Sequence, residues 1–255
     1  MQLLTGSGTV RGILRAIVAL ARRHGAEYHP GCWIQELEGG LSLHCDAAIA
    51  DGAGVQVLRL PDCLLVPLDG IAWRPGLDRP QRLENPAGLT ALHHEMLDLH
   101  SELFASAGHL QRTAEQSPGW RLGGVPAIAG AVAALRRGEL PSFPTVMDAL
   151  LATRAVAWTG PAGSRQSVLA PIIDCANHSP DAGHFTPHPD ALAATMTRRL
   201  PDDECRVAYG RNKDALDLAL RYGFFDEQAS VAHSCPLELD LPGLGRVEVL
   251  GERYR

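Results

Sequence analysis

The sequence predicts an α+β protein, mostly β, in which a helical insert interrupts a fold of small curved sheets. Short β-favouring runs separated by glycine occupy residues 31–67. Between about residues 68 and 160 apolar side chains recur at helical spacing, and short β runs return after Pro161. Because the two β-rich parts flank the helices, they must meet in space. We expect one domain over 1–255, with a first β part at about 1–68, an insert at about 69–160 and a second β part at about 161–255.

An amphipathic helix is expected near the N-terminus, followed by strands. Val10–His24 carries Ile13, Leu14 and Ile17 at helical spacing, and Gly25 follows the basic last turn as a stop signal. The β runs that come next predict strands at Cys32–Ile34, Leu41–Cys45, Val55–Leu60 and Cys63–Val66. Such short, glycine-bounded strands are typical of a small, strongly bent antiparallel sheet.

The insert and the second β part continue the same alternation. Apolar periodicity in the insert predicts helices at Leu89–Ala107, Pro126–Arg137 and Thr145–Trp158. The segment after Pro161 predicts strands at Ala191–Thr197 and Cys205–Ala208, a helix at Lys213–Tyr222, and strands near Leu237–Leu241 and Arg246–Leu250.

Composition excludes several functional classes. A chain of 255 residues buries an ample core without a metal or disulfide. Its net charge of -6 argues against a nucleic-acid partner, because phosphate binding requires a basic stripe. The apolar stretch Gly12–Ala21 is too short to span a bilayer. We expect a cytoplasmic protein with no membrane partner.

The cysteines and histidines do not form a standard metal motif. The six cysteines are scattered without a CxxC pair, so free thiols and no metal are expected. His93-His94-Glu95 opens a near match to the HExxH zinc motif, but Asp98 stands where the second histidine belongs, which favours a solvated helix face. The neighbouring residues His178, His184 and His188 fit no standard ligand spacing.

Polar residues at the end of an apolar run mark the most informative stretch. Asp174, Asn177 and His178 follow Leu169–Ile173, and buried polar groups must be hydrogen-bonded, so they form either a structural network or a site. Tyr209-Gly210 ends a later strand-like segment, where an aromatic residue of the core is the simpler interpretation.

The order of these motifs resembles a known family. Asp174-x2-Asn177-His178, then Glu204-x4-Tyr209-Gly210, then Leu218-x3-Tyr222-Gly223-Phe224 resemble the C-terminal half of SET-domain methyltransferases of the Rubisco large-subunit methyltransferase type. Upstream, Gly40-Leu-Ser-Leu43 is similar to the first SET segment. Arg154 falls where that family has an arginine before the Asn-His motif.

The resemblance implies a SET fold around a knot-like chain crossing and S-adenosyl-L-methionine as cofactor. It implies a protein-lysine N-methyltransferase acting on a protein substrate that bears a lysine. Tyr209 would be the catalytic residue, orienting the amine or the methyl group as a neutral phenol. Tyr222 and Phe224 would line the substrate channel, with core packing as the alternative. The cofactor-binding residues would be Glu38, Gly40, Leu41, Arg154, Asp174, Asn177 and His178.

Departures from the family pattern leave a second hypothesis open. Ser42 replaces the second glycine of the first motif, and we expect the helical substrate-binding domain that often follows in this family to be absent. The alternative is a SET-like scaffold that binds or converts a small-molecule substrate in a biosynthetic pathway without methyl transfer. A non-enzymatic binding module on the same fold is a third interpretation.

Overall fold

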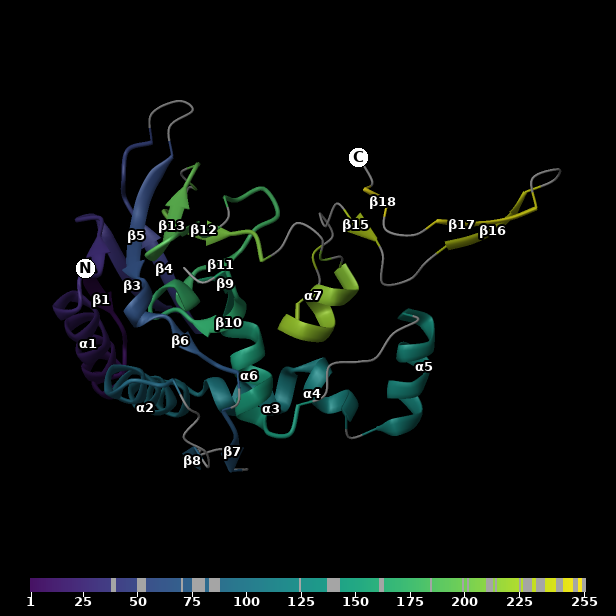
Figure 1. The fold of residues 1–255 in the computed structure, drawn as a ribbon, viewed down its shortest axis with the longest axis horizontal. Coiled ribbons are helices and arrows are strands. Elements are labelled where there is room, and N and C mark those ends of the chain that lie inside the picture. Colours follow the sequence, from purple (N-terminus) through teal and green to yellow (C-terminus); the bar gives the residue numbers. More distant parts are fainter. Residues whose placement is uncertain are drawn as a thin grey trace.

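The structure is a computed structural model, and it describes residues 1–37, 40–49, 54–69, 71–74, 81–82, 88–123, 125–136, 143–160, 163–183, 185–198, 200, 202–209, 213, 215–224, 226, 231–232, 237–241, 245–249 and 252–253. The predicted mixed α+β fold is confirmed, because small sheets and short helices make up the described chain (Figure 1).

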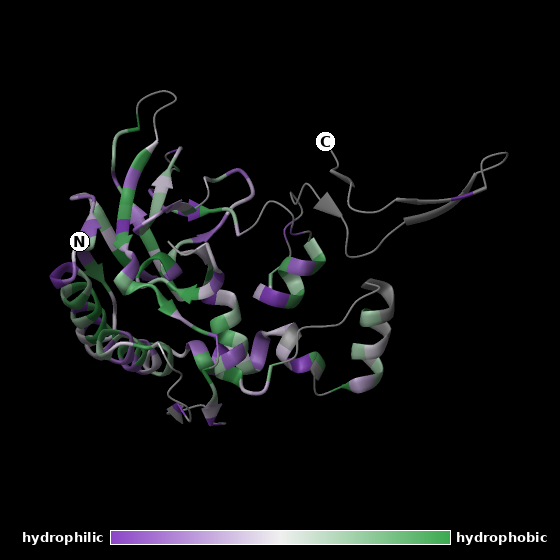
Figure 2. Ribbon diagram, viewed as in Figure 1, coloured by the Kyte–Doolittle hydropathy of each residue, from purple (hydrophilic) through white to green (hydrophobic). Residues whose placement is uncertain are grey.

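Helix α1 (Gly8–Arg23) confirms the predicted N-terminal helix. Its N-cap is Ser7, whose Oγ accepts a hydrogen bond from the Val10 N–H at 3.3 Å. The buried face includes Ile13, Leu14 and Ile17, as the periodicity predicts. Figure 2 shows hydrophobic residues concentrated on α1 and on the strands beside it. No helix among the described residues is both long enough and apolar enough to cross a membrane.

Two sheets form most of the first β part. In one, β1 (Gln2–Leu4) lies parallel to β3 (Cys32–Leu37), which pairs antiparallel with β4 (Gly40–Cys45). The other has the order β12-β13-β5-β2, so strands of the second β part complete it. Its members are β2 (Glu27–Tyr28), β5 (Val55–Pro61), β12 (Phe185–His188) and β13 (Ala191–Met196).

A third sheet corrects two predictions. The predicted strand Cys63–Val66 is instead a 3-10 turn, η1 (Asp62–Leu64), because the Leu65 N–H bonds back to the Asp62 carbonyl at 2.9 Å. Strand β6 (Val66–Pro67) follows and pairs with β10 (Arg165–Leu169).

The predicted helix Thr145–Trp158 is too long. Helix α6 (Val146–Arg154) ends at Arg154, and the next residues form β9 (Ala155–Thr159), antiparallel to β10. In that register Val156 lies opposite Val168 and Trp158 opposite Gln166. Pairing with a neighbouring strand overrides the helical periodicity here, since β propensity depends on cross-strand neighbours.

The insert contains further helices that the periodicity does not resolve. Helices α2 (Ala91–Ser106) and α5 (Pro126–Arg136) match two predictions. Between them lie α3 (His109–Gln116) and α4 (Pro118–Gly123), which were not predicted, and strands β7 (Trp73–Arg74) and β8 (Gln81–Arg82) form a short pair before α2.

The interpretation of His93 as part of a solvated helix face is wrong. His93 is buried, and it caps the start of α2 reciprocally with Thr90, whose N–H donates to His93 Nδ1 at 3.3 Å. The other ring nitrogen of His93, Nε2, lies 3.1 Å from the Cys63 carbonyl oxygen. This histidine therefore fastens α2 to η1.

The two β-rich parts meet beside β4, as predicted. The Cys205 N–H donates to the Leu43 carbonyl at 2.8 Å, and the Cys45 N–H donates to the Asp203 carbonyl at 2.9 Å. The predicted strand Cys205–Ala208 shortens to β14 (Arg206–Val207), which runs parallel to β11 (Asn177–His178). Helix α7 (Ala215–Tyr222) follows. The remaining strands are β15 (Val231–Ala232), β16 (Leu237–Leu241), β17 (Gly245–Val249) and β18 (Glu252–Arg253).

Candidate active site

Three polar side chains from distant parts of the sequence join at the chain crossing. Asn177 Nδ2 donates to Ser42 Oγ at 3.0 Å and to Glu204 Oε1 at 2.6 Å. Ser42 Oγ in turn donates to Glu204 Oε1 at 2.5 Å. Arg206 Nε reaches the other carboxylate oxygen, Oε2, at 2.5 Å. We name Ser42, Asn177 and Glu204 the crossing network.

The crossing network holds a buried carboxylate in its ionised form. Burial alone raises the pKa of Glu204, but hydrogen bonds from Ser42, Asn177 and Arg206 outweigh it and lower that pKa below its usual value. Glu204 and Ser42 are 6% and 1% exposed, whereas Asn177 is exposed, and the network joins the two β-rich parts.

His178 is fixed in one tautomer between two partners. Its Nδ1 accepts a hydrogen bond from the Tyr209 N–H at 3.1 Å, so the ring proton lies on Nε2. Nε2 is 3.2 Å from Asp226 Oδ2, to which it donates. Burial lowers the pKa of His178 despite the carboxylate, which keeps the imidazole neutral near pH 7.

Tyr209 stands at the centre of an aromatic cluster. Its ring centroid lies 4.7 Å from that of Tyr222, 5.1 Å from that of His178 and 6.3 Å from that of Phe224. Its hydroxyl donates to the Ala176 carbonyl at 3.0 Å, and burial raises its pKa to about 12. The phenol is therefore neutral and oriented, with the lone pairs of its oxygen still able to accept hydrogen bonds.

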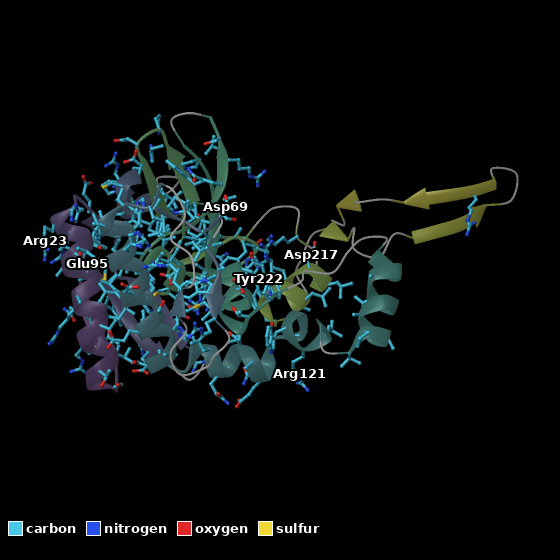
Figure 3. All side chains as sticks on the ribbon, turned by 60° about the horizontal axis from the view of Figure 1, so that its bottom comes forward. Arg23, Asp69, Glu95, Arg121, Asp217 and Tyr222 are labelled. Carbon is cyan, nitrogen blue, oxygen red and sulfur yellow. The ribbon has the colours of Figure 1, made fainter. Side chains whose placement is uncertain are left out.

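A cavity of about 540 Å³ opens beside this cluster, within the size range of small-molecule sites. Tyr209, Tyr222, Asp174 and Arg154 all line it. Figure 3 labels Tyr222 and Asp69, two residues of the lining. Asp174 follows Ile172, whose φ of 71° is rare for a β-branched residue, so a strained turn positions this wall.

One lysine side chain lies in the same cavity. Lys213, the only lysine in the sequence, lines the cavity, and its Nζ lies 5.6 Å from the ring centroid of Tyr222. Burial lowers its pKa, and the nearby Arg221 guanidinium lowers it further. The wall of the cavity thus carries a lysine whose pKa lies below its usual value.

A second, smaller cavity of about 160 Å³ adjoins the first through Arg154. His109 lines it and is 3% exposed, yet neither ring nitrogen has a hydrogen-bond partner in the described part of the chain. Arg112 also lines it, and a Cβ on Gly40 would lie 3.2 Å from His109 Nε2. Gly40 itself has a φ of 134°, which favours glycine.

The structure brings only some of the predicted site residues together. Tyr209, Tyr222, Arg154 and Asp174 share the larger cavity, and Arg154 donates to the Asp174 carbonyl at 2.6 Å. Asn177, His178 and Phe224 do not line it and belong to the crossing network and the aromatic cluster. Gly40 and Leu41 lie on β4, where Gly40 approaches the smaller cavity. Glu38, together with Gly210, lies outside the described residues.

Sequence reasoning missed three functional candidates. Glu204 stands in the quoted motif, but a lone glutamate carried no separate signal. Lys213 is conspicuous once lysines are counted, because it is unique in the chain. His109 belongs to a helix that was not predicted, and its burial has no local sequence signature.

No family model and no curated protein matches the chain. Among solved structures, the SET domain of LSMT bound to lysine and AdoHcy matches with a TM-score of 0.49 and 14% identity, over 96% of this chain and 68% of that one. Rubisco LSMT bound to AdoMet matches with a TM-score of 0.47 and 13% identity, over 95% of this chain and 67% of that one. The SET domain of LSMT bound to methyllysine and AdoHcy matches with a TM-score of 0.47 and 15% identity, over 89% of this chain and 60% of that one.

The chain is similar to these SET-domain structures, and it spans between 60% and 68% of the length of those proteins.

Proposed function

We propose that the chain is an S-adenosyl-L-methionine-dependent protein-lysine N-methyltransferase. The observation that supports this most directly is the position of Lys213, whose amine lies in the cavity beside Tyr222 and near Tyr209. A lysine must lose a proton before its nitrogen is nucleophilic, and this cavity lowers the pKa of a lysine amine. The same surroundings would act on a lysine presented by a substrate protein.

Tyr209 would position the reacting amine. Its hydroxyl hydrogen is engaged by the Ala176 carbonyl, so the oxygen accepts a hydrogen bond from an N–H of the amine. The His178 and Phe224 rings pack around the phenol and hold its orientation. Positioning is the main contribution that a displacement reaction asks of the protein.

The residues near the smaller cavity, which holds only about 160 Å³, suit the carboxylate end of the cofactor. The two ring nitrogens of buried His109 have no hydrogen-bond partner among the described residues and could bind a polar group of the cofactor. Arg112 and Arg154, which line the same cavity, suit a carboxylate. S-adenosyl-L-methionine supplies, when bound, the methyl group and the sulfonium leaving group. Gly40 on β4 approaches this cavity, where a Cβ would lie 3.2 Å from His109 Nε2. Asn177 would act through the crossing network and His178 through the aromatic cluster.

Calorimetric titration with S-adenosyl-L-methionine and transfer of labelled methyl groups to lysine-bearing proteins test the proposal. Binding near one equivalent and label on substrate lysines are expected. Tyr209→Phe should keep cofactor binding and lose about 100-fold in transfer rate, the scale of a lost positioning contact. Tyr28→Phe is the matched control, because Tyr28 is a largely buried tyrosine on another sheet.

Lys213→Arg separates transfer to a substrate from transfer to the enzyme itself. Since Lys213 is the only lysine, label on a lysine side chain of the enzyme must disappear in this variant. Absence of cofactor binding, or equal transfer by Tyr209→Phe and wild type, contradicts the proposed function.

The small-molecule hypothesis is favoured by a different feature of the same cavity. Arg154, Arg165 and Arg221 all line it, and this density of guanidinium groups suits an anionic small molecule. Thermal-shift screening with carboxylates and phosphate esters tests this. Saturable binding of such an anion, without methyl transfer to it or to proteins, favours the second hypothesis.

A further inference from the structure

A second cluster of chemically reactive side chains lies at the end of the β3–β4 pair. His29 Nδ1, Cys32 Sγ and Cys45 Sγ all lie within 4.8 Å of one another. Cys32 and Cys45 face each other in the strand register, and they are 2% and 0% exposed. Imidazole and thiolate are the ligands that zinc prefers in structural sites.

The distances in this cluster match those around a tetrahedral ion. His29 Nδ1 lies 3.4 Å from Cys45 Sγ. With Zn–S near 2.3 Å and Zn–N near 2.0–2.1 Å, neighbouring sulfur and nitrogen ligands of a tetrahedral zinc are about 3.6 Å apart. The two side chains therefore need little movement to share one ion.

The imidazole of His29 is held in the tautomer that metal binding requires. Its Nδ1 accepts the Gly31 N–H at 3.2 Å, so the ring proton lies on Nε2, and zinc binding at Nδ1 would replace the hydrogen bond from Gly31. A Cβ on Gly31 would lie 1.6 Å from Asp46 Oδ1, so only glycine leaves room there for that carboxylate.

A third thiol approaches from the second β part. Cys205 is buried, and it follows Glu204, which pairs with His44 next to Cys45. The backbone around Cys205 is fixed, because its N–H bonds to Leu43 on β4. Its Sγ lies 3.8 Å from Met196 Sδ, so the side chain must turn away from Met196 to reach the ion.

We propose that His29, Cys32, Cys45 and Cys205 bind one zinc ion as a structural site. Binding releases the three thiol protons to solvent, and the ion is held by three thiolates and one imidazole nitrogen. The ion would tie β4 to the segment that carries Glu204 and thus reinforce the crossing network. The His29-x2-Cys32 spacing is the sequence signal for it. This proposal does not depend on methyl transfer.

Metal analysis of the full-length chain, purified without chelators from zinc-supplemented cells, tests the site. About one zinc per chain is expected, falling to near zero in Cys32→Ser and Cys45→Ser. Cys175→Ser and Cys63→Ser are the matched controls, one buried and one exposed, and both should keep the zinc. In Cys205→Ser the affinity should fall about tenfold or more.

Cobalt substitution of the wild-type chain keeps the test independent of whether variants fold. A tetrahedral thiolate site gives an intense thiolate-to-cobalt charge-transfer band in the near ultraviolet, which zinc should displace. The proposal is overturned if the purified wild-type chain contains no zinc and shows no charge-transfer band after cobalt is added. A Cys32–Cys45 disulfide in unreduced protein also overturns it, and unchanged zinc affinity in Cys205→Ser removes Cys205 from the site.

Discussion

The side-chain nitrogen of Asn177 lies 3.0 Å from the hydroxyl oxygen of Ser42, although the two residues are 135 positions apart. Both also bond to the same oxygen of Glu204. Ser42 occupies the place where the related motif carries a glycine. In this chain it supplies a hydroxyl that links the first β part to the second.

Ser42→Ala should destabilise the chain by about 2 kcal/mol, because it removes a buried hydrogen bond to a charged carboxylate. Urea unfolding measures the change. Ser164→Ala, at an exposed position on the turn between β9 and β10, should stay within about 0.5 kcal/mol of wild type. Equal midpoints for the two variants contradict a structural role for the crossing network.

Glu204 should make the free energy of unfolding depend on pH in the acidic range. Its pKa is lowered in the folded chain, so its contribution is fully present above the unfolded value of about 4.3 and is lost as pH falls through the folded pKa. Urea midpoints between pH 6 and 3 should fall more steeply for wild type than for Glu204→Gln. Glu27→Gln, on an exposed residue of β2, should keep the wild-type slope. Parallel slopes for wild type and Glu204→Gln would refute this assignment.

The elements with a strong local pattern were predictable from the sequence. Helix α1 combines a serine cap with a clear apolar face, and the β3–β4 pair combines β-favouring residues with Gly40 at its turn. The motifs at Asn177 and Tyr209 also pointed to one region, because polar residues at the end of an apolar run need partners.

The remainder depends on contacts between distant residues. Val156 and Trp158 continue the helical spacing of the preceding residues, but they pair with strand β10 in a sheet. His93 has the composition of an exposed helix face, but its packing against η1 buries it. Similarly, no local sequence pattern predicts the contact of Cys45 with His29 or that of Ser42 with Glu204. Both contacts depend on how strands and segments distant in the sequence pair with one another.

Tyr209 should remain a neutral phenol well above pH 9. Burial raises its pKa to about 12, whereas an exposed tyrosine ionises near 10. Tyrosinate absorbance of wild type minus Tyr209→Phe should therefore show no phenolate up to about pH 11. If methyl transfer is the activity, its kcat/KM should keep rising to about pH 10 as the lysine amine deprotonates. A difference signal centred near pH 10 contradicts the buried environment.

Replacing His109 should raise the stability of the chain and lower its affinity for the cofactor. Because its two buried nitrogens have no partner among the described residues, His109→Leu should stabilise the chain by about 1 kcal/mol. The same change should weaken S-adenosyl-L-methionine binding about tenfold, the equivalent of one lost polar contact. His100→Leu is the matched control, because buried His100 donates from Nδ1 to the Met96 carbonyl at 2.9 Å and should lose stability instead. Chemical denaturation and calorimetry on both variants measure the two effects. If His109→Leu loses stability as His100→Leu does, the histidine is a packing residue and the cofactor site lies elsewhere.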